Sequence, residues 1–261
     1  MALKTRRPSG KPTWHITLLT GKEKVGKSHW IAEASACRLI HRTFWLPVGE
    51  LDPDEYGIIP GADFEIIEHD GTLEDIIYQL TEAVMEDPGP NGEPNLIAVD
   101  SAGLIWTMLV ERAQAIADAR VAARHGGEIP EGMPVEIPSD VWTRTRKQWG
   151  EFMRVLRMHH GPVLLTARTD TITLNGVDGE RSADKVKAEK NLVYDVDSVI
   201  EMPTRGELIL SGVRSGRLKL DGPQRSNGLK PEGFWTLLGL DQIKAEPRRF
   251  TELRPAAGIE P

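Results

Sequence analysis

The stretch Gly21-Lys22-Glu23-Lys24-Val25-Gly26-Lys27-Ser28 matches the pattern G-x-x-x-x-G-K-[ST] at every required position. In this pattern the glycines let backbone N–H groups approach a β-phosphate, the lysine contacts the β and γ oxygens, and the serine hydroxyl is a ligand for Mg²⁺. We therefore predict that residues 21–28, with the adjacent His29, bind ATP and Mg²⁺. The alternative is a glycine-rich turn with no ligand.

The sequence on either side of this motif has the pattern that a phosphate loop requires. Residues 14–20 (WHITLLT) form a short apolar run that is typical of a buried strand. Residues 27–40 contain no Gly or Pro and space their apolar residues as a helix does. A phosphate held between the two would lie at a helix N-terminus, where free N–H groups and the helix dipole favour an anion.

Three further predicted strands, at residues 43–48, 96–100 and 162–168, end at or just before a polar residue. These residues are Glu50, Asp100 and Arg168. Because ligands bind outside the carboxyl ends of parallel strands, we expect all three near the phosphates. Asp100 is predicted to bind the metal together with Ser28. Glu50 is predicted to orient or deprotonate the attacking water. Arg168 is predicted to sense the γ-phosphate. A solvated loop acid is the alternative for Glu50.

The remaining pattern predicts helices at 73–84 and 102–124 and from 139 onward, with a Gly/Pro-rich loop at 125–138. Residues 169–191 are predicted to be a long loop, either functional or disordered, with the cations Arg181, Lys185, Lys187 and Lys190. Later strands are predicted at 194–202 and 207–220. The second carries Arg214, Arg217 and Lys219, which can be ordinary strand-edge charges.

The composition narrows the class of protein. The net charge is −7, which argues against coating nucleic acid by bulk electrostatics. Residues 43–110 hold fifteen Asp or Glu and no Lys or Arg, so the rest of the chain is net positive. A single cysteine, Cys37, excludes a disulfide framework. The sequence has no apolar run of membrane-spanning length and no secretory signal, so we predict a cytoplasmic protein without a membrane partner.

The predicted organisation is one α/β domain with flanking segments. Residues 1–13, with Lys4, Arg6, Arg7 and Lys11, are predicted to be a flexible basic arm. Residues 14–220 are predicted to form the core, a mostly parallel central sheet flanked by helices with late antiparallel strands. Residues 221–261 are rich in Pro and Gly and are predicted to be a carboxyl-terminal tail.

Taken together, the phosphate loop and the strand ends resemble those of a RecA-like P-loop ATPase. The WLPVGE and LIAVDS strands, the QWGEF helix, LLTAR and YDVDSVIEM resemble those of phage nucleotide-binding proteins with a minimal RecA core, a group associated with single-strand annealing and recombination. Arg168 stands where RecA-type recombinases usually have glutamine. The resemblance covers about residues 14–220.

This resemblance implies an enzyme that hydrolyses ATP with Mg²⁺ while acting on single-stranded DNA. It implies further copies of the chain as partners, in a ring or a filament, together with a single-strand binding protein, all in the host cell cytoplasm. Because a neighbouring subunit often supplies a catalytic cation in this family, Arg214, Arg217 and Lys219 are the candidates for it. The candidate DNA contacts are Arg181, Lys185, Lys187 and Lys190. A helicase-type or loader ATPase and a small-molecule kinase are the alternatives. For the kinase, the loop at 125–138 would supply the lid.

Overall fold

The apolar run before the phosphate loop forms β1 (Ile16–Gly21), a central strand in which every residue is buried. It lies between two parallel neighbours, β5 (Val163–Gly176) and β7 (Ser198–Met202). At its carboxyl end Gly21 is opposite Arg168 on one side and Met202 on the other. The phosphate loop therefore leaves the sheet from its interior. The computed structural model describes residues 3–176, 179–242 and 244–251, with backbone only at 171–176 and 179–183.

The sheet has the strand order β3-β2-β4-β5-β1-β7-β8-β9, and β6 (Gly179–Val186) pairs with β5 alone. Pairing is parallel from β3 to β7 and antiparallel beyond it. The predicted fold class, α/β with a mostly parallel sheet and late antiparallel strands, is confirmed. The other strands are β2 (Thr43–Pro47), β3 (Glu65–Ile66), β4 (Leu96–Asp100), β8 (Ile209–Val213) and β9 (Gln224–Arg225).

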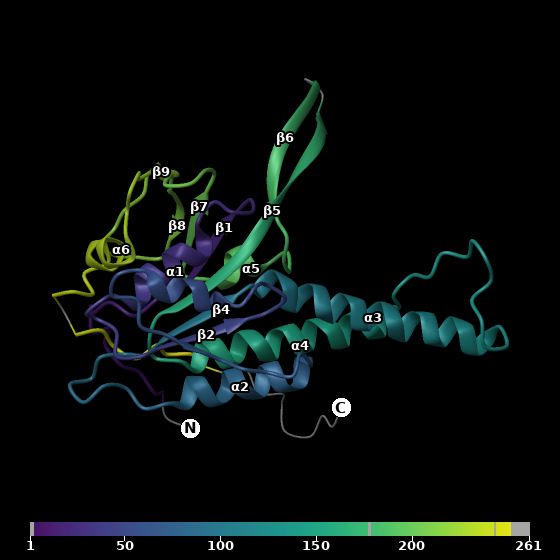
Figure 1. The fold of residues 1–261 in the computed structure, drawn as a ribbon, viewed down its shortest axis with the longest axis horizontal. Coiled ribbons are helices and arrows are strands. Elements are labelled where there is room, and N and C mark those ends of the chain that lie inside the picture. The colour runs from purple at the N-terminus through teal and green to yellow at the C-terminus, as the bar shows by residue number, and fades with distance from the viewer. Residues whose placement is uncertain (1–2, 177–178, 243, 252–261) are drawn as a thin grey trace.

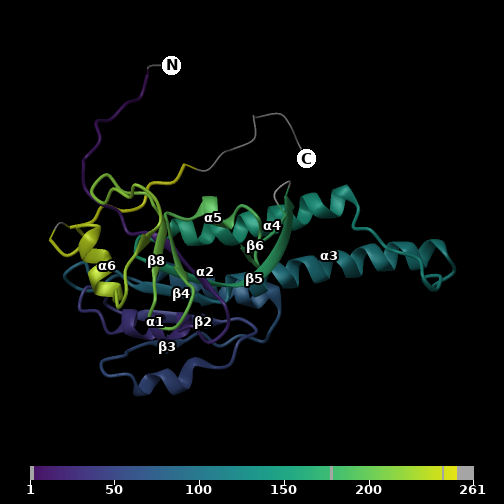
Figure 2. The ribbon, with the colours of Figure 1, turned by 90° about the horizontal axis from the view of Figure 1, so that it is seen from above.

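Helices cover both faces of the sheet and create two hydrophobic cores (Figure 2). On one face α2 (Leu73–Met85), α3 (Ala102–Arg124) and α4 (Ser139–Met158) pack against Leu18, Val99 and Leu165. On the other face α1 (Lys27–Ser35) and α6 (Pro231–Leu237) pack against alternate residues of the same strands, including Leu19 and Ala98. Burial on both faces explains why these strands are mostly apolar.

Helices α3 and α4 form one helical hairpin that extends well beyond the sheet (Figure 1). Helix α3 has the predicted limits, and the segment 125–138 is irregular, as its Gly and Pro content predicted. This segment connects the two helices at the tip of the pair. Near the sheet the two helices are joined by an aromatic cluster, in which the rings of Trp106 and Trp142 stack with centroids 6.3 Å apart. Within the described residues, none of the helices combines the length and apolar character that crossing a membrane requires.

The prediction of a long loop at 169–191 is wrong. Strand β5 continues past Arg168 to Gly176 and pairs with β6 as an antiparallel hairpin, which projects from the body in Figure 1. The register runs from Thr169 opposite Val186 to Gly176 opposite Gly179. The turn dipeptides Asn175-Gly176 and Asp178-Gly179 indicated a hairpin of this kind, because Asn-Gly and Asp-Gly favour tight turns between paired strands.

The later part of the chain also differs from the prediction. Residues 192–195 form a short helix, α5 (Leu192–Asp195), and only Ser198–Met202 and Ile209–Val213 are strand. Arg214, Arg217 and Lys219 therefore follow β8 in irregular backbone and do not lie on a strand. The predicted run at 207–220 contains two glycines and several charged residues, which weaken a strand.

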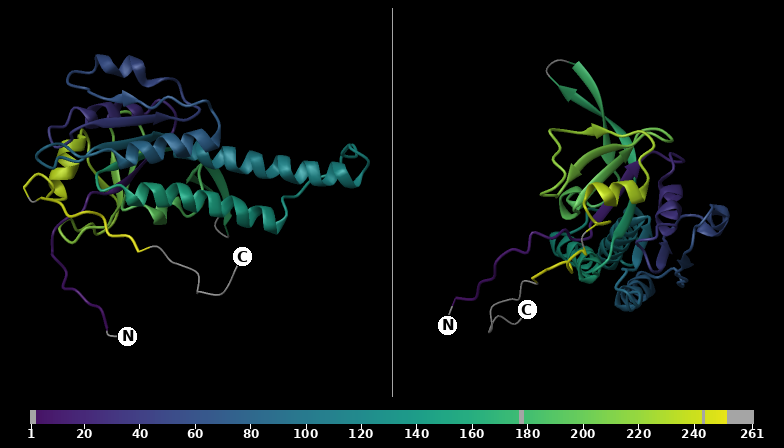
Figure 3. Two further views of the ribbon diagram at one scale, coloured as in Figure 1. Left: turned by 90° about the horizontal axis from the view of Figure 1, so that it is seen from below. Right: turned by 90° about the vertical axis from the view of Figure 1, so that its left-hand side faces the viewer.

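Part of the predicted tail, residues 221–261, is packed into the core. Phe234 and Trp235 of α6 are fully buried, and the Trp235 ring meets Trp14 edge to face with centroids 5.5 Å apart. Farther on, the buried guanidinium of Arg248 donates to the carbonyl oxygens of Trp14 (2.9 Å) and Gly161 (3.2 Å). Residues 3–11 are exposed, and the amino-terminal trace leaves the body (Figure 3). The core therefore extends past residue 220.

Candidate functional site

The phosphate loop is a tight turn between β1 and α1. Gly26, at the helix N-cap, has a φ of 108°, a conformation that residues with a side chain rarely adopt. A Cβ atom on Gly21 would lie 2.3 Å from the carbonyl oxygen of Met202. A larger residue at position 21 would therefore push β7 away from β1. Both glycines of the motif are required by this backbone geometry.

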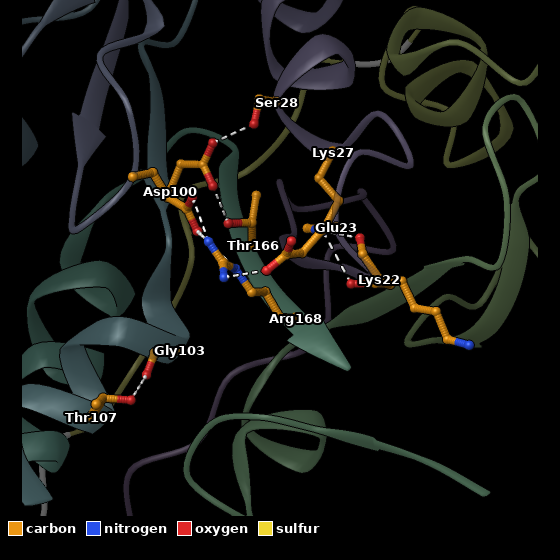
Figure 4. Close-up of polar contacts among 11 residues, drawn as sticks. Lys22, Glu23, Lys27, Ser28, Asp100, Gly103, Thr107, Thr166 and Arg168 are labelled. Atoms are coloured by element: carbon orange, nitrogen blue, oxygen red, sulfur yellow. Dashed lines mark hydrogen bonds and ion pairs between the residues drawn. The ribbon is translucent and has the colours of Figure 1, made fainter. Parts of the chain in front are cut away.

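Lys27, the first residue of α1, folds its side chain back over the loop (Figure 4). Its Nζ donates to the carbonyl oxygens of Gly21 at 3.1 Å and Lys22 at 2.7 Å. Burial lowers the pKa of Lys27, and the nearby Asp100 and Glu50 oppose that shift. The loop thus holds a cation at the N-terminus of a helix, which is where an anionic phosphate is favoured.

The other predicted loop residues have different environments. Val25 is buried in the core and fixes the turn. Lys22 and Lys24 are exposed. The ring of His29 lies 3.9 Å from Glu33, one turn along α1, so this side chain interacts with its own helix.

Ser28 and Asp100 meet across the sheet ends, as the sequence predicted. The Ser28 Oγ donates to Asp100 Oδ2 at 2.7 Å, and Thr166 donates to Asp100 Oδ1 (Figure 4). Burial raises the pKa of Asp100, while these two hydrogen bonds favour its ionised form. Thr166 was missed by the sequence analysis. Its signal was a polar residue within the apolar strand PVLLTAR, two positions before Arg168 and so on the same face.

Arg168 and Glu50 also meet, and a loop residue joins them. Arg168 Nη2 lies 2.8 Å from each carboxylate oxygen of Glu50, and its Nε lies 3.1 Å from Oε1. Its Nη1 donates to Glu23 of the phosphate loop at 2.7 Å (Figure 4). The hydrogen bonds that Arg168 donates to Glu50 are the main cause of the raised pKa of Arg168. Glu23 was predicted to contact nucleotide, and its contact with Arg168 was not anticipated.

The position of Glu50 depends on the turn after β2. Gly49 has a φ of 62°, and this left-handed residue lets the chain reverse directly after the strand. The Val48 N–H donates to the carbonyl oxygen of Asp100 at 2.6 Å, which ties the turn to the end of β4. Glu50 is therefore held at the same sheet end as Asp100 and Arg168.

Ser28 and Asp100 fit a magnesium ion. They present a hydroxyl and a carboxylate oxygen 2.7 Å apart beside the loop, and Mg²⁺ prefers such hard oxygen ligands. Mg²⁺ usually keeps several waters and takes only one or two protein ligands in addition to phosphate oxygens. In the described residues no group of three or more His, Cys, Asp or Glu could hold a metal.

The candidate DNA contacts lie along β6 and the segment after it. Lys185 and Lys190 are exposed, and Lys187 Nζ lies 3.6 Å from Asp170 Oδ2 on the facing strand. The side chain of Arg181 lies outside the described residues. The Lys187 N–H donates to the carbonyl oxygen of Arg168 at 2.8 Å, so the base of the hairpin is bonded to the site.

Arg214, Arg217 and Lys219 lie at the opposite end of the sheet from the phosphate loop. Val213, which precedes them, is opposite Ser198, which in turn pairs with Thr17 near the start of β1. Arg214 forms an ion pair with Asp197 at 3.4 Å, and Arg217 donates to the carbonyl oxygen of Gly10 at 3.1 Å. Lys219 is exposed. Arg214 also lines the pocket to which Gly21 and Lys22 of the phosphate loop belong.

A pocket of about 490 Å³ lies beside the loop, next to β1, β7 and β8. It is lined by Gly21 and Lys22, by the hairpin base at Thr169 and Val186, and by Tyr194 of α5. Tyr194 is 85% exposed. The pocket is therefore open to solvent and partly apolar, and it adjoins the phosphate loop.

No protein-family model and no curated protein matches this chain. Among solved structures, the crystal structure of the RadB recombinase is similar in shape, with 16% sequence identity and a TM-score of 0.44. The match covers 84% of this chain and 86% of that one. We draw no functional assignment from this likeness.

Proposed function

We propose that this chain is an ATPase with a RecA-like core that binds ATP and Mg²⁺ and acts on single-stranded DNA. The observation that carries the proposal is the convergence of four strand ends. Lys27 and Ser28 follow β1, Glu50 follows β2, Asp100 ends β4 and Arg168 lies on β5, and they interact through direct hydrogen bonds or charges. A glycine-rich turn without a ligand would not require these side chains to lie close together.

Each residue would contribute a separate part of phosphoryl transfer. Lys27 and the loop N–H groups would hold the β- and γ-phosphates, and Ser28 and Asp100 would hold the metal, Asp100 through water. Magnesium, when bound, would offset charge on the phosphate oxygens. Glu50 would orient the attacking water, which displaces ADP in line from the γ-phosphorus. A cation from a neighbouring copy, with Arg214, Arg217 and Lys219 as candidates, would complete the charge balance.

The hairpin supports a role on a polymer that lies outside the site. It projects from the body and has exposed lysines on β6 and just after it. Because Lys187 is bonded to Arg168 through the backbone, a strand bound there would contact an element that reaches the phosphates. We propose single-stranded DNA as the partner, in recombination or annealing of phage type, with side-by-side assembly of copies and a single-strand binding protein acting on the same DNA.

The site itself is tested by Lys27→Ala. We expect loss of ATP turnover, because the γ-phosphate loses the cation that the loop positions. The matched control is Lys244→Ala, which removes an exposed lysine outside the phosphate loop. ATP consumption is measured with and without single-stranded DNA, alongside the mass in solution. Unchanged turnover in Lys27→Ala would exclude this site.

The alternatives are separated by their products. A helicase-type enzyme would unwind forked DNA, whereas an annealing protein pairs complementary strands without moving along them. A kinase would transfer the phosphate to a small acceptor. The segment 125–138, which was the expected kinase lid, lies at the tip of the α3–α4 pair, far from the phosphate loop in Figure 1.

A further inference from the structure

Arg168 is bound at the same time by two carboxylates from different parts of the site. Glu50, from the turn after β2, occupies the Nε and Nη2 side of the guanidinium. Glu23, from the phosphate loop, binds Nη1. Since the guanidinium is planar with its donors in fixed directions, the two carboxylates hold it in one orientation over the loop.

The charges around the loop make this arrangement sensitive to phosphate. Two cations, Lys27 and Arg168, interact electrostatically with three carboxylates, Glu23, Glu50 and Asp100. The net charge of these five side chains, when all are ionised, is therefore −1. A third phosphate entering beside Lys27 would compete with Glu23 for the same guanidinium, because both are anions on the loop side of Arg168.

We propose that Glu23 is a positioning residue that acts through Arg168 and tunes the discrimination between nucleoside triphosphate and diphosphate. A diphosphate leaves the Glu23–Arg168 bond in place. A triphosphate displaces Glu23 from Arg168 Nη1, and because that ion pair must break, the net affinity for the triphosphate is lower. This inference rests on the proposed function, and it assigns a role to a loop residue that the phosphate-binding pattern leaves unspecified.

The test compares the affinities for ADP and for a non-hydrolysable ATP analogue, both with Mg²⁺, by calorimetry. In Glu23→Gln the ratio of triphosphate to diphosphate affinity should rise about two- to fivefold, as befits a largely exposed ion pair. Glu23→Ala, which also removes the acceptor oxygen, should raise it at least as much. In an Arg168→Ala background the Glu23 variants should leave the ratio unchanged, since the residue through which Glu23 acts is gone.

Glu201→Gln is the matched control for charge alone. Glu201 pairs with Thr20 in the register of β7 and β1 and is bonded to Ser211, so its removal takes one negative charge from beside the loop without touching Arg168. If Glu23→Gln tightens both nucleotides equally, as this control should, Glu23 acts only by charge and the inference fails. If the wild-type chain binds neither nucleotide, the proposed function fails with it.

Discussion

Replacing Asp100 with asparagine separates the stability of the fold from the chemistry of the site. Asp100 is only 6% exposed and accepts hydrogen bonds from Ser28 and Thr166. Asparagine has nearly the same shape and keeps both contacts, because its Oδ1 can accept from Thr166 and its Nδ2 can donate to the Ser28 hydroxyl. The substitution therefore removes a buried charge and keeps a hydrogen bond to each of the two neighbouring side chains.

The sign of the effect follows from the pKa of Asp100. Burial raises the folded-state pKa above the unfolded value of 3.8. A carboxyl group of this kind contributes stability below the unfolded pKa, and the contribution is lost as the pH rises through the folded pKa. At pH 8 the ionised carboxylate thus costs stability that asparagine does not. We expect Asp100→Asn to gain about 1–2 kcal/mol in free energy of unfolding at pH 8.

The assay is thermal unfolding followed by circular dichroism between pH 4 and pH 8. The gain at pH 8 corresponds to a Tm higher by about 2–8 °C. It should shrink as the pH falls through the raised pKa of Asp100. Thr166→Val is the opposing variant. It removes a donor to the carboxylate and should cost about 1–3 kcal/mol at pH 8. An Asp100→Asn protein less stable than wild type at pH 8, or a gain independent of pH, would refute the reasoning.

Three further predictions concern the hairpin, the carboxyl-terminal segment and a buried histidine. Lys185→Glu with Lys187→Glu should weaken binding of single-stranded DNA and reduce the slope of log affinity against log salt by about one to two, and an unaltered slope in a salt titration would remove the hairpin from the DNA contact. Arg248→Ala should lower the free energy of unfolding by about 2–4 kcal/mol, because the guanidinium that joins Trp14, just before β1, to the end of α4 is lost; denaturant unfolding checks this, and the exposed Arg249→Ala is its control. Burial lowers the pKa of His159 to about 4 from 6.5, so the stability that its neutral form contributes is present above pH 6.5 and lost as the pH falls to about 4. His159→Gln should therefore flatten the pH dependence of Tm over that window, whereas the exposed His160→Gln should leave the slope as it is.

Local sequence was sufficient wherever a few adjacent residues define the geometry. The phosphate loop is an example, since its two glycines, Lys27 and Ser28 lie within one turn and the helix start that follows it. The apolar strands β1, β4 and the first half of β5 were predictable because burial on both faces demands an uninterrupted apolar run. The strand-end positions of Glu50, Asp100 and Arg168 followed from these strands.

What the tertiary structure alone decided are the contacts between distant segments. Arg168 is 118 residues from Glu50 and 145 residues from Glu23 along the chain. No local pattern specifies that one guanidinium binds both, because that depends on β5 lying between β4 and β1 in the sheet. The same holds for Thr166 beside Asp100 and for Arg248 beside Trp14. The sequence by itself determined the phosphate loop and the strand ends, and the strand order determined which side chains meet there, since pairing between strands depends on long-range packing.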